Sequence, residues 1–461
     1  MLKDLRLIDS QQPIYRQLAD AIAERISTGQ LEAGERLPPQ REIARSLGVN
    51  LTTVTRAFAT LQQRGLIEGK AGRGTVVRHP EQGPATAFKS APSDDSGIVD
   101  LSVNRPAIPA YLNALATLLP RLAKDARYPG LQDYHPPEGP HWARKAVADW
   151  LQPAIGPCSG QVILTDGAQH GLACTLASIA RPGDVILADA VTYQGINALC
   201  RSLGLDLRSL AMDRQGMMPD HFETACQQWR PRAVFLVPSY QNPTAVTLPM
   251  ERRRALLATA RQYNVILIED DVYRPLLDTP QQTFASLAPD LTVYVSGFSK
   301  CVAPGLRLGF VVPPRALVGD VAAALRINCW SISPLTALIG TVMLEDGVIH
   351  DLVSRQKEEL RQRQALVHQI LKDFDIQTGD TSTHFWLHLP EPWRSNIFVR
   401  VCQKRGIGVL GAEAFAVGRD AVAHAVRVNV AAARSHSDLI RALESLADLL
   451  RSGHLHLHDG V

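Results

Sequence analysis

The sequence contains no run of apolar residues long enough to cross a membrane. A spanning helix needs about 18 consecutive apolar residues, and no stretch of the 461 residues approaches that length. The first residues, Met-Leu-Lys-Asp-Leu-Arg, also lack the apolar core of a secretory signal. These two absences predict a cytoplasmic protein.

Paired cysteines are also missing. The seven cysteines form no Cys-x-x-Cys pair, and their number is odd. Zinc sites usually show paired spacing and disulfide frameworks an even count, so we expect neither. Three alternating histidines near the C-terminus, His454 to His458, offer metal ligands, but such alternation at a chain end is more often incidental. The sequence therefore predicts reduced cysteines and no metal.

The chain has little excess charge of either sign, because 48 Lys and Arg nearly balance 45 Asp and Glu. Residues 1–80 nevertheless contain 12 Lys and Arg against 8 Asp and Glu, whereas the remainder contains 36 against 37. Because Lys and Arg bind nucleic acids by neutralising phosphates, this local excess indicates a nucleic-acid partner. The length favours roughly two to four domains.

Hydrophobic periodicity predicts helices in the basic N-terminal part. Apolar residues recur every four positions from Ile14 to Ile26, so residues 13–28 are predicted to form an amphipathic helix. Residues 37–48 and 49–65 predict two more helices separated by a short turn at Gly48, which is the helix-turn-helix pattern.

The glycine-rich stretch that follows, residues 67–77, predicts a small hairpin with a cationic tip. Its glycines superficially match a phosphate-binding loop, but no Lys-Ser or Lys-Thr ending and no helix follows them. A hairpin after a helix-turn-helix forms a wing, so the domain is predicted to be mainly helical with a small β-wing.

Residues 13–78 resemble the winged helix-turn-helix domain of the GntR family. The resemblance implies a domain over residues 1–78 that binds double-stranded operator DNA through Arg41, Asn50, Thr52, Thr53, Arg56 and Arg73. Leu51 and Thr55 depart from the family, because both stand where arginine is common, so the operator sequence is not implied. The alternative is a helical interaction module that does not contact DNA.

Residues 79–97 are rich in Pro, Ser and Ala without periodicity and predict a linker. From Ile98 onward, short apolar runs alternate with helical stretches, which predicts an α/β domain over residues 98–455 with a mostly parallel, buried sheet. The predicted strands are residues 162–164, 185–188, 233–237, 265–268, 292–295 and 309–312.

Polar residues follow three of these strands. Asn242 comes after residues 233–237, Asp270 and Tyr273 after 265–268, and Lys300 after 292–295. Ligands of such sheets bind outside the carboxyl ends of the strands, so these side chains are predicted to converge. Taken singly, each also fits a turn, a solvated loop or a surface lysine.

The sequence predicts that the Lys300 amine reacts with an aldehyde. A lysine amine that is partly desolvated at a strand end has a lowered pKa and condenses with aldehydes. Ser296, Ser299 and Arg307 offer phosphate ligands beside it, so the stretch predicts a site for the phosphorylated aldehyde pyridoxal 5′-phosphate (PLP).

Other residues suit the remaining parts of PLP. Asp270 would keep the ring nitrogen protonated, whereas Asn242 and Tyr273 would bind the phenolic oxygen. Tyr193 would stack on the ring. The helix that follows Asp166 in Asp-Gly-Ala-Gln-His would present its N-terminus to the phosphate.

Residues 98–450 resemble fold-type I aminotransferases nearly throughout. The resemblance implies that Lys300 forms a Schiff base with PLP and that Asp270 and Tyr273 assist catalysis. It further implies that Ala168, Gln169, Ser299 and Arg307 bind the phosphate. Tyr134 matches a tyrosine that reaches the phosphate of the neighbouring subunit, and Arg427 matches the arginine that binds the substrate carboxylate. Arg427 also fits a purely structural arginine in a small-domain strand.

The combination of both domains resembles the MocR-type transcriptional regulators. That resemblance implies a homodimer whose large domain senses an amine, an amino acid or a vitamin B6 compound. Two alternatives remain open at this point. One is an active aminotransferase with a residual DNA-binding domain, and the other is a scaffold that holds PLP only for stability.

Overall fold

The computed structural model of the chain describes residues 13–27, 30–31, 35–63, 66–70, 74–77, 98–158, 160–418 and 422–452. The chain divides into two compact units, residues 1–90 and 91–461. The predicted linker at residues 79–97, the wing residue Arg73 and the histidines at 454–458 lie outside the described residues.

The first unit is a three-helix domain with a β-hairpin. Its elements are α1 (Ile14–Ser27), α2 (Gln40–Leu47), α3 (Leu51–Gln63), β1 (Ile67–Lys70) and β2 (Gly74–Val77). The two strands pair antiparallel, as predicted for the wing. One side of each helix contributes to a single core that includes Leu18, Ile22, Ile43, Val54 and Phe58.

The second helix begins at Gln40 rather than at Leu37. The backbone N–H of Leu37 donates to the Thr75 carbonyl at 2.9 Å, so this residue extends along the hairpin. Pro39 follows with an extended backbone, and the residue before a proline disfavours the helical region. The helix ends at Gly48, whose φ of 64° lies in the left-handed region that a glycine C-cap adopts readily.

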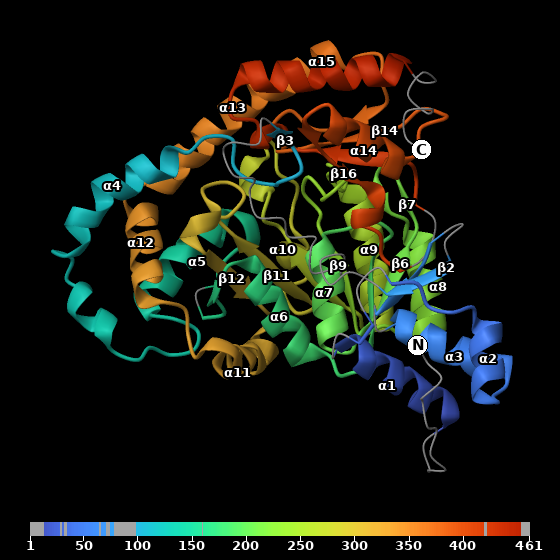
Figure 1. Ribbon diagram of the computed structural model, residues 1–461. Coiled ribbons are helices and arrows are strands. Elements are labelled where there is room, and N and C mark those ends of the chain that lie inside the picture. The colour runs from blue at the N-terminus through green and yellow to red at the C-terminus, as the bar shows by residue number, and fades with distance from the viewer. Residues whose placement is uncertain are drawn as a thin grey trace. The chain divides into compact units, whose positions relative to one another are not determined.

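The second unit is built on a seven-stranded sheet in the order β4-β12-β11-β10-β9-β5-β6 (Figure 1). Adjacent strands in this sheet are parallel, except that β12 is antiparallel to both β11 and β4. The strands are β4 (Ile163–Asp166), β5 (Val185–Asp189), β6 (Asp206–Leu210), β9 (Ala233–Leu236), β10 (Ile266–Asp270), β11 (Thr292–Gly297) and β12 (Leu308–Val312). A mostly parallel sheet is thereby confirmed.

Both faces of this sheet are covered. In β9, Ala233 and Phe235 join the hydrophobic cluster that contains residues of α6, whereas Val234 and Leu236 join a second cluster with residues of α8 and α9. Burial on both faces explains why these strands are continuous apolar runs in the sequence. The helices of this part are α5 (His141–Ile155), α6 (Ala168–Ile179), α7 (Gln194–Ser202), α8 (Pro219–Trp229), α9 (Met250–Tyr263), α10 (Phe284–Leu287) and α11 (Val318–Cys329).

A smaller antiparallel sheet, β13-β14-β17-β16, forms the core of the C-terminal part, where Figure 1 shows α15 lying beside α13. Its strands are β13 (Ile376–Gln377), β14 (Phe385–His388), β16 (Leu410–Gly411) and β17 (Ala425–Val428). The other helices of this unit are α4 (Ala110–Leu122), α12 (Pro334–Glu345), α13 (Val348–Ile370), α14 (Ser395–Lys404) and α15 (His436–Ser452). A separate short hairpin joins β7 (Met212–Asp213) to β8 (Gly216–Met217).

The start of the second unit is tied to its C-terminal part. The strand β3 (Val99–Asp100) pairs in parallel with β15 (Ile407–Gly408). The Asn429 N–H donates to the Leu101 carbonyl at 2.8 Å. The beginning of the second unit is therefore held against its C-terminal part by both contacts. Among the helices of the described ranges, none is long and apolar enough to cross a membrane.

Candidate functional site

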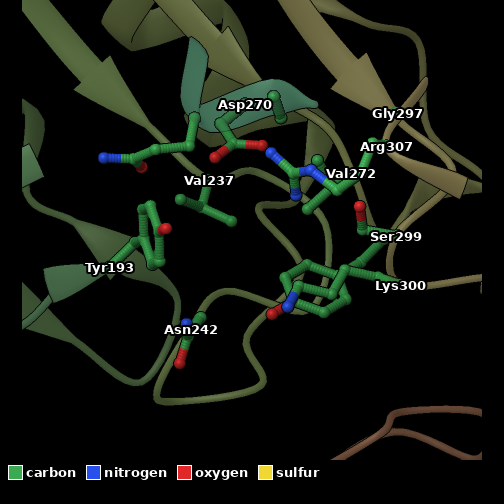
Figure 2. Close-up of a pocket in the computed structure, with 12 residues that line it drawn as sticks. Tyr193, Val237, Asn242, Asp270, Val272, Gly297, Ser299, Lys300 and Arg307 are labelled. Atoms are coloured by element: carbon green, nitrogen blue, oxygen red, sulfur yellow. The ribbon is translucent and has the colours of Figure 1, made fainter. Parts of the chain in front are cut away.

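The carboxyl ends of three adjacent strands meet at one cavity. In the sheet, β10 lies between β9 and β11. Asn242 follows β9, Asp270 ends β10 and Lys300 follows β11, and all three line the same cavity. Figure 2 shows their side chains around this common space, with Tyr193 at one side. The convergence expected from the sequence is therefore present in the structure.

Nine of the ten residues predicted to bind the cofactor line this cavity. They are Ala168, Gln169, Tyr193, Asn242, Asp270, Tyr273, Ser299, Lys300 and Arg307. The tenth, Tyr134, is 88% exposed and packs against Trp330 at 5.3 Å between ring centroids. Ser296 is buried in β11, where its hydroxyl donates to the Asp271 carbonyl at 3.2 Å. The cavity is lined by Gly297 in its place.

Lys300 is placed to act as a nucleophile. Its Nζ donates to the Asn104 carbonyl at 3.0 Å. Burial, reinforced by the Arg427 guanidinium and opposed by Asp270, lowers the pKa of Lys300 to about 8. A larger fraction of this amine than of an ordinary lysine is therefore uncharged near neutral pH, and only the uncharged amine attacks a carbonyl.

Asp270 is a buried carboxylate with an unused oxygen. Its Oδ1 has no hydrogen-bond partner among the described residues. Burial, opposed by the N–H of Val272 and the charge of Lys300, raises the pKa of Asp270 to about 7. A buried acceptor without a donor is costly, so this oxygen suits a ligand that brings its own N–H group.

Other groups that line the cavity suit an anion. The helix α6 begins at Ala168, directly after Gly167, and helix N-termini present free backbone N–H groups. Arg307 lies across from it and donates to the Asp166 carbonyl at 2.6 Å. A Cβ on Gly167 would come within 2.8 Å of the Arg307 guanidinium, so the close approach requires glycine. Ser299 adds a hydroxyl to the same cavity.

Arg427 lies next to the cavity in β17 and is buried. Its Nη1 donates to Asn242 Oδ1 at 2.7 Å and its Nη2 to the Ser102 carbonyl at 2.5 Å. Its Nε has no hydrogen-bond partner among the described residues. Burial lowers the pKa of Arg427 to about 10, but the group stays cationic at neutral pH. A buried cation without a carboxylate partner suits an anionic ligand group.

Sequence reasoning missed Ser102, Asn104 and His384. Asn104 Nδ2 donates to the Tyr273 hydroxyl at 2.5 Å, and its carbonyl accepts from Lys300. His384 contacts the Gln241 carbonyl at 3.1 Å through Nε2, and burial together with Arg427 lowers its pKa to about 3, so it is neutral. No spacing or composition signal marks these residues, because their partners lie far away in the sequence.

In the first unit, the predicted DNA-contact residues lie on and around α2 and α3. Arg41 and Arg56 are exposed on α2 and α3, and Asn50 and Thr52 are exposed at the start of α3. Thr53 is half-buried. Arg73 lies outside the described residues, so its predicted contact stays a prediction. Within the described ranges, no group of three His, Cys, Asp or Glu side chains is arranged to hold a metal ion.

Both units match known families. Residues 96–446 match the family of class I and II aminotransferases, and residues 14–77 match the bacterial regulatory proteins of the gntR family. The chain is 28% identical to the HTH-type transcriptional regulator YdeF of Bacillus subtilis, over 96% of this chain and 95% of that protein. It is 30% identical to the probable rhizopine catabolism regulatory protein MocR of Rhizobium meliloti, over 67% of each.

The chain belongs to the MocR-type transcriptional regulators. Another relative of this MocR-type regulator is the vitamin B6 salvage pathway transcriptional repressor PtsJ of Salmonella typhimurium, at 29% identity over 90% of this chain and 93% of that protein. The fold of the second unit of the present chain is similar to that of kynurenine aminotransferase of Pyrococcus horikoshii. The TM-score is 0.70, with 21% identity over 80% of this chain and 96% of that one.

The aminotransferase-like domain of this MocR-type regulator is PLP-dependent, and the residues of the cavity fit PLP. Asp270 Oδ1 matches the protonated ring nitrogen, and the α6 N-terminus with Arg307 and Ser299 matches the phosphate. Lys300, which lines the same cavity, would take the aldehyde. The structure thus assembles the predicted PLP ligands from five separate stretches of the chain.

Proposed function

We propose that this MocR-type regulator senses a small amine or amino acid, or a vitamin B6 compound, at the Lys300 site and changes its operator affinity in response. One observation carries the proposal. Lys300 donates to the Asn104 carbonyl at 3.0 Å, and Arg427 donates to the Ser102 carbonyl at 2.5 Å. The two basic side chains that an amino acid effector would meet therefore bind the same short backbone segment.

That segment, residues 98–104, directly follows the predicted linker to the DNA-binding unit. An effector carboxylate on Arg427 would compete with the Ser102 carbonyl, and an effector amine that displaces Lys300 would release its Nζ to donate to the Asn104 carbonyl, as it does in the structure. Occupancy of the site thus changes what holds the segment. A ligand shifts a conformational equilibrium only through such differential contacts.

When bound, PLP supplies an electrophilic carbon that amines attack and a ring that withdraws electrons. Residues of the chain would attach PLP and control its protonation. Lys300 would supply the amine that attaches PLP and could also serve as a base beside the effector. Asp270 would keep the ring nitrogen protonated, and the Tyr273 hydroxyl, which accepts from Asn104, would be free to donate to the phenolic oxygen.

At the DNA, Arg41, Arg56 and Arg73 supply phosphate contacts, whereas Asn50, Thr52 and Thr53 lie nearest to the base edges. Cations close to phosphates give affinity without sequence preference, and short polar side chains at base edges give discrimination. The half-burial of Thr53 makes Thr52, which is exposed, the more accessible of the two.

The regulator acts as a homodimer in this proposal. Large apolar side chains are exposed on the helical part of the second unit, around α4, α11 and α12. They are Leu112, Leu119, Tyr128, Tyr134, Ile327, Trp330 and Leu335. Exposed apolar groups of this size gather where a partner covers them. A second copy would bury them and bring Tyr134 to the phosphate site of its partner.

We therefore expect Ile327→Glu to weaken dimerisation by at least 10-fold, because a charge on this 86%-exposed residue would be buried in the dimer. Sedimentation velocity over a concentration series measures the change. Gln228→Glu is the matched control, since it adds the same charge to the exposed polar face of α8. Equal dimerisation of both variants contradicts this interface.

The sensing role is tested with common amino acids, simple amines and pyridoxal. Each is titrated into the holoprotein while visible absorbance and operator affinity are recorded, and product keto acid is assayed separately. We expect at least one compound to change both signals together, with a change in operator affinity of about 5- to 150-fold. Turnover should be slow. Rapid keto-acid formation with an operator affinity that no compound changes would instead establish an aminotransferase.

A further inference from the structure

The recognition helix α3 has an apolar side chain on its exposed face. Its buried face consists of Val54, Ala57, Phe58 and Leu61, at helical spacing. The residues exposed on the other side are Leu51, Thr52, Thr55, Arg56, Ala59 and Gln62. Leu51, the first residue of the helix, is 40% exposed and is the only large apolar side chain among these six.

Leu51 belongs to a surface hollow within the first unit. The hollow is lined by residues of α1 and α3: Ile14, Tyr15, Leu51, Thr52, Thr53, Thr55 and Arg56. Thr55 lies one turn after Leu51, and its hydroxyl faces Gln40 Oε1 at 2.9 Å and the Leu51 carbonyl at 3.0 Å. That hydroxyl is therefore engaged within the protein, and Leu51 beside it presents only an apolar surface.

Only one base presents an apolar group in the major groove of DNA, namely thymine with its C5-methyl. Arginine at the start of a recognition helix pairs with guanine, whereas aliphatic side chains contact the thymine methyl. The cations Arg41 and Arg56 are exposed nearby and suit phosphates, so DNA is the occupant that the charge of this surface favours.

We propose that Leu51 reads the methyl group of a thymine in each operator half-site. The proposal rests on the DNA-binding role of the first unit and adds a base preference to it. A partner protein on the same hollow would predict no dependence on that methyl group.

The test begins with an operator selected from random DNA by the full-length holoprotein. Each thymine of a half-site is then replaced in turn by uracil, which removes only the methyl group. We expect one replacement to weaken binding by about 4-fold, the effect of one buried methyl. Leu51→Ala should bind dT and dU equally at that position and keep its responses to uracil elsewhere. Leu51→Met, which keeps an apolar side chain, should still prefer dT.

Ile14→Ala is the matched control, because Ile14 lines the same hollow from α1 and is similarly exposed. This variant should retain the preference for dT over dU. The proposal is overturned if wild-type protein tolerates uracil at every position, or if Leu51→Ala keeps the full preference. Failure to select any operator would overturn the DNA-binding role itself, which is a different result.

Discussion

Replacing Lys300 with alanine is expected to abolish covalent attachment of PLP and, with it, any effect of amines on operator affinity. Lys300 lines the cavity, and burial lowers the pKa of its amine to about 8, which makes it the nucleophile of the site. The α6 N-terminus, Arg307 and Ser299 should still hold some PLP through the phosphate. Basal operator affinity should stay within about 2-fold, because the substitution lies outside the DNA-binding unit.

Borohydride reduction followed by peptide mapping measures the attachment directly. Wild-type protein should carry the modification on Lys300, and Lys300→Ala should carry none. The exposed Lys124 provides a control, because Lys124→Ala should remain fully modified. Modification of another lysine in the native protein would show that the site has been assigned wrongly.

The second large effect concerns stability. Arg253 is wholly buried and donates to three backbone carbonyls, those of Leu248 at 3.0 Å, Pro238 at 3.0 Å and Gln282 at 2.9 Å. It also lies 3.7 Å from the buried carboxylate of Glu269. Removing the guanidinium takes this donor from the buried Leu248 and Gln282 carbonyls, whereas the Pro238 carbonyl still accepts from the Leu248 N–H and Glu269 from the N–H groups of Phe284 and Ala285. We expect Arg253→Met to lower the free energy of unfolding by about 3–5 kcal/mol.

Tryptophan fluorescence during urea unfolding reports this change in the second unit alone, since all six tryptophans lie in it. The neighbouring Arg254 is exposed, so Arg254→Met should alter the free energy of unfolding by no more than about 0.5 kcal/mol. Two variants of equal stability would mean that the contacts of Arg253 contribute nothing net. Because Pro238 follows β9 closely, the same arginine also fixes the chain that leads to Asn242.

Much of the site was predictable because its residues follow buried strands. Parallel strands enclosed on both faces are continuous apolar runs, and their carboxyl ends share one edge, so sequence order alone brings Asn242, Asp270 and Lys300 together. The edge strand β6 was missed because Asp206–Leu210 mixes polar and apolar residues and is only partly buried. Of the small-sheet strands, only the one around Arg427 was anticipated, and the short strands β13 and β16 have two residues each, too few for a recognisable pattern.

The role of Asn104 could not be predicted for a different reason. It follows the short strand β3 in an irregular segment, and its partners Tyr273 and Lys300 lie 169 and 196 positions away. Contacts over such separations depend on the completed fold rather than on local pattern. The late start of α2 likewise follows from a tertiary contact, the Leu37 hydrogen bond to the wing.

In this proposal, effector binding and operator binding are coupled, so each changes the affinity of the protein for the other ligand. The most direct measurement is the affinity of the holoprotein for the compound that shifts its absorbance most, determined with saturating operator and with random DNA. Operator should change that affinity by the same factor, about 5- to 150-fold, by which the compound changes operator affinity. Identical effector affinities with operator and random DNA would contradict the account.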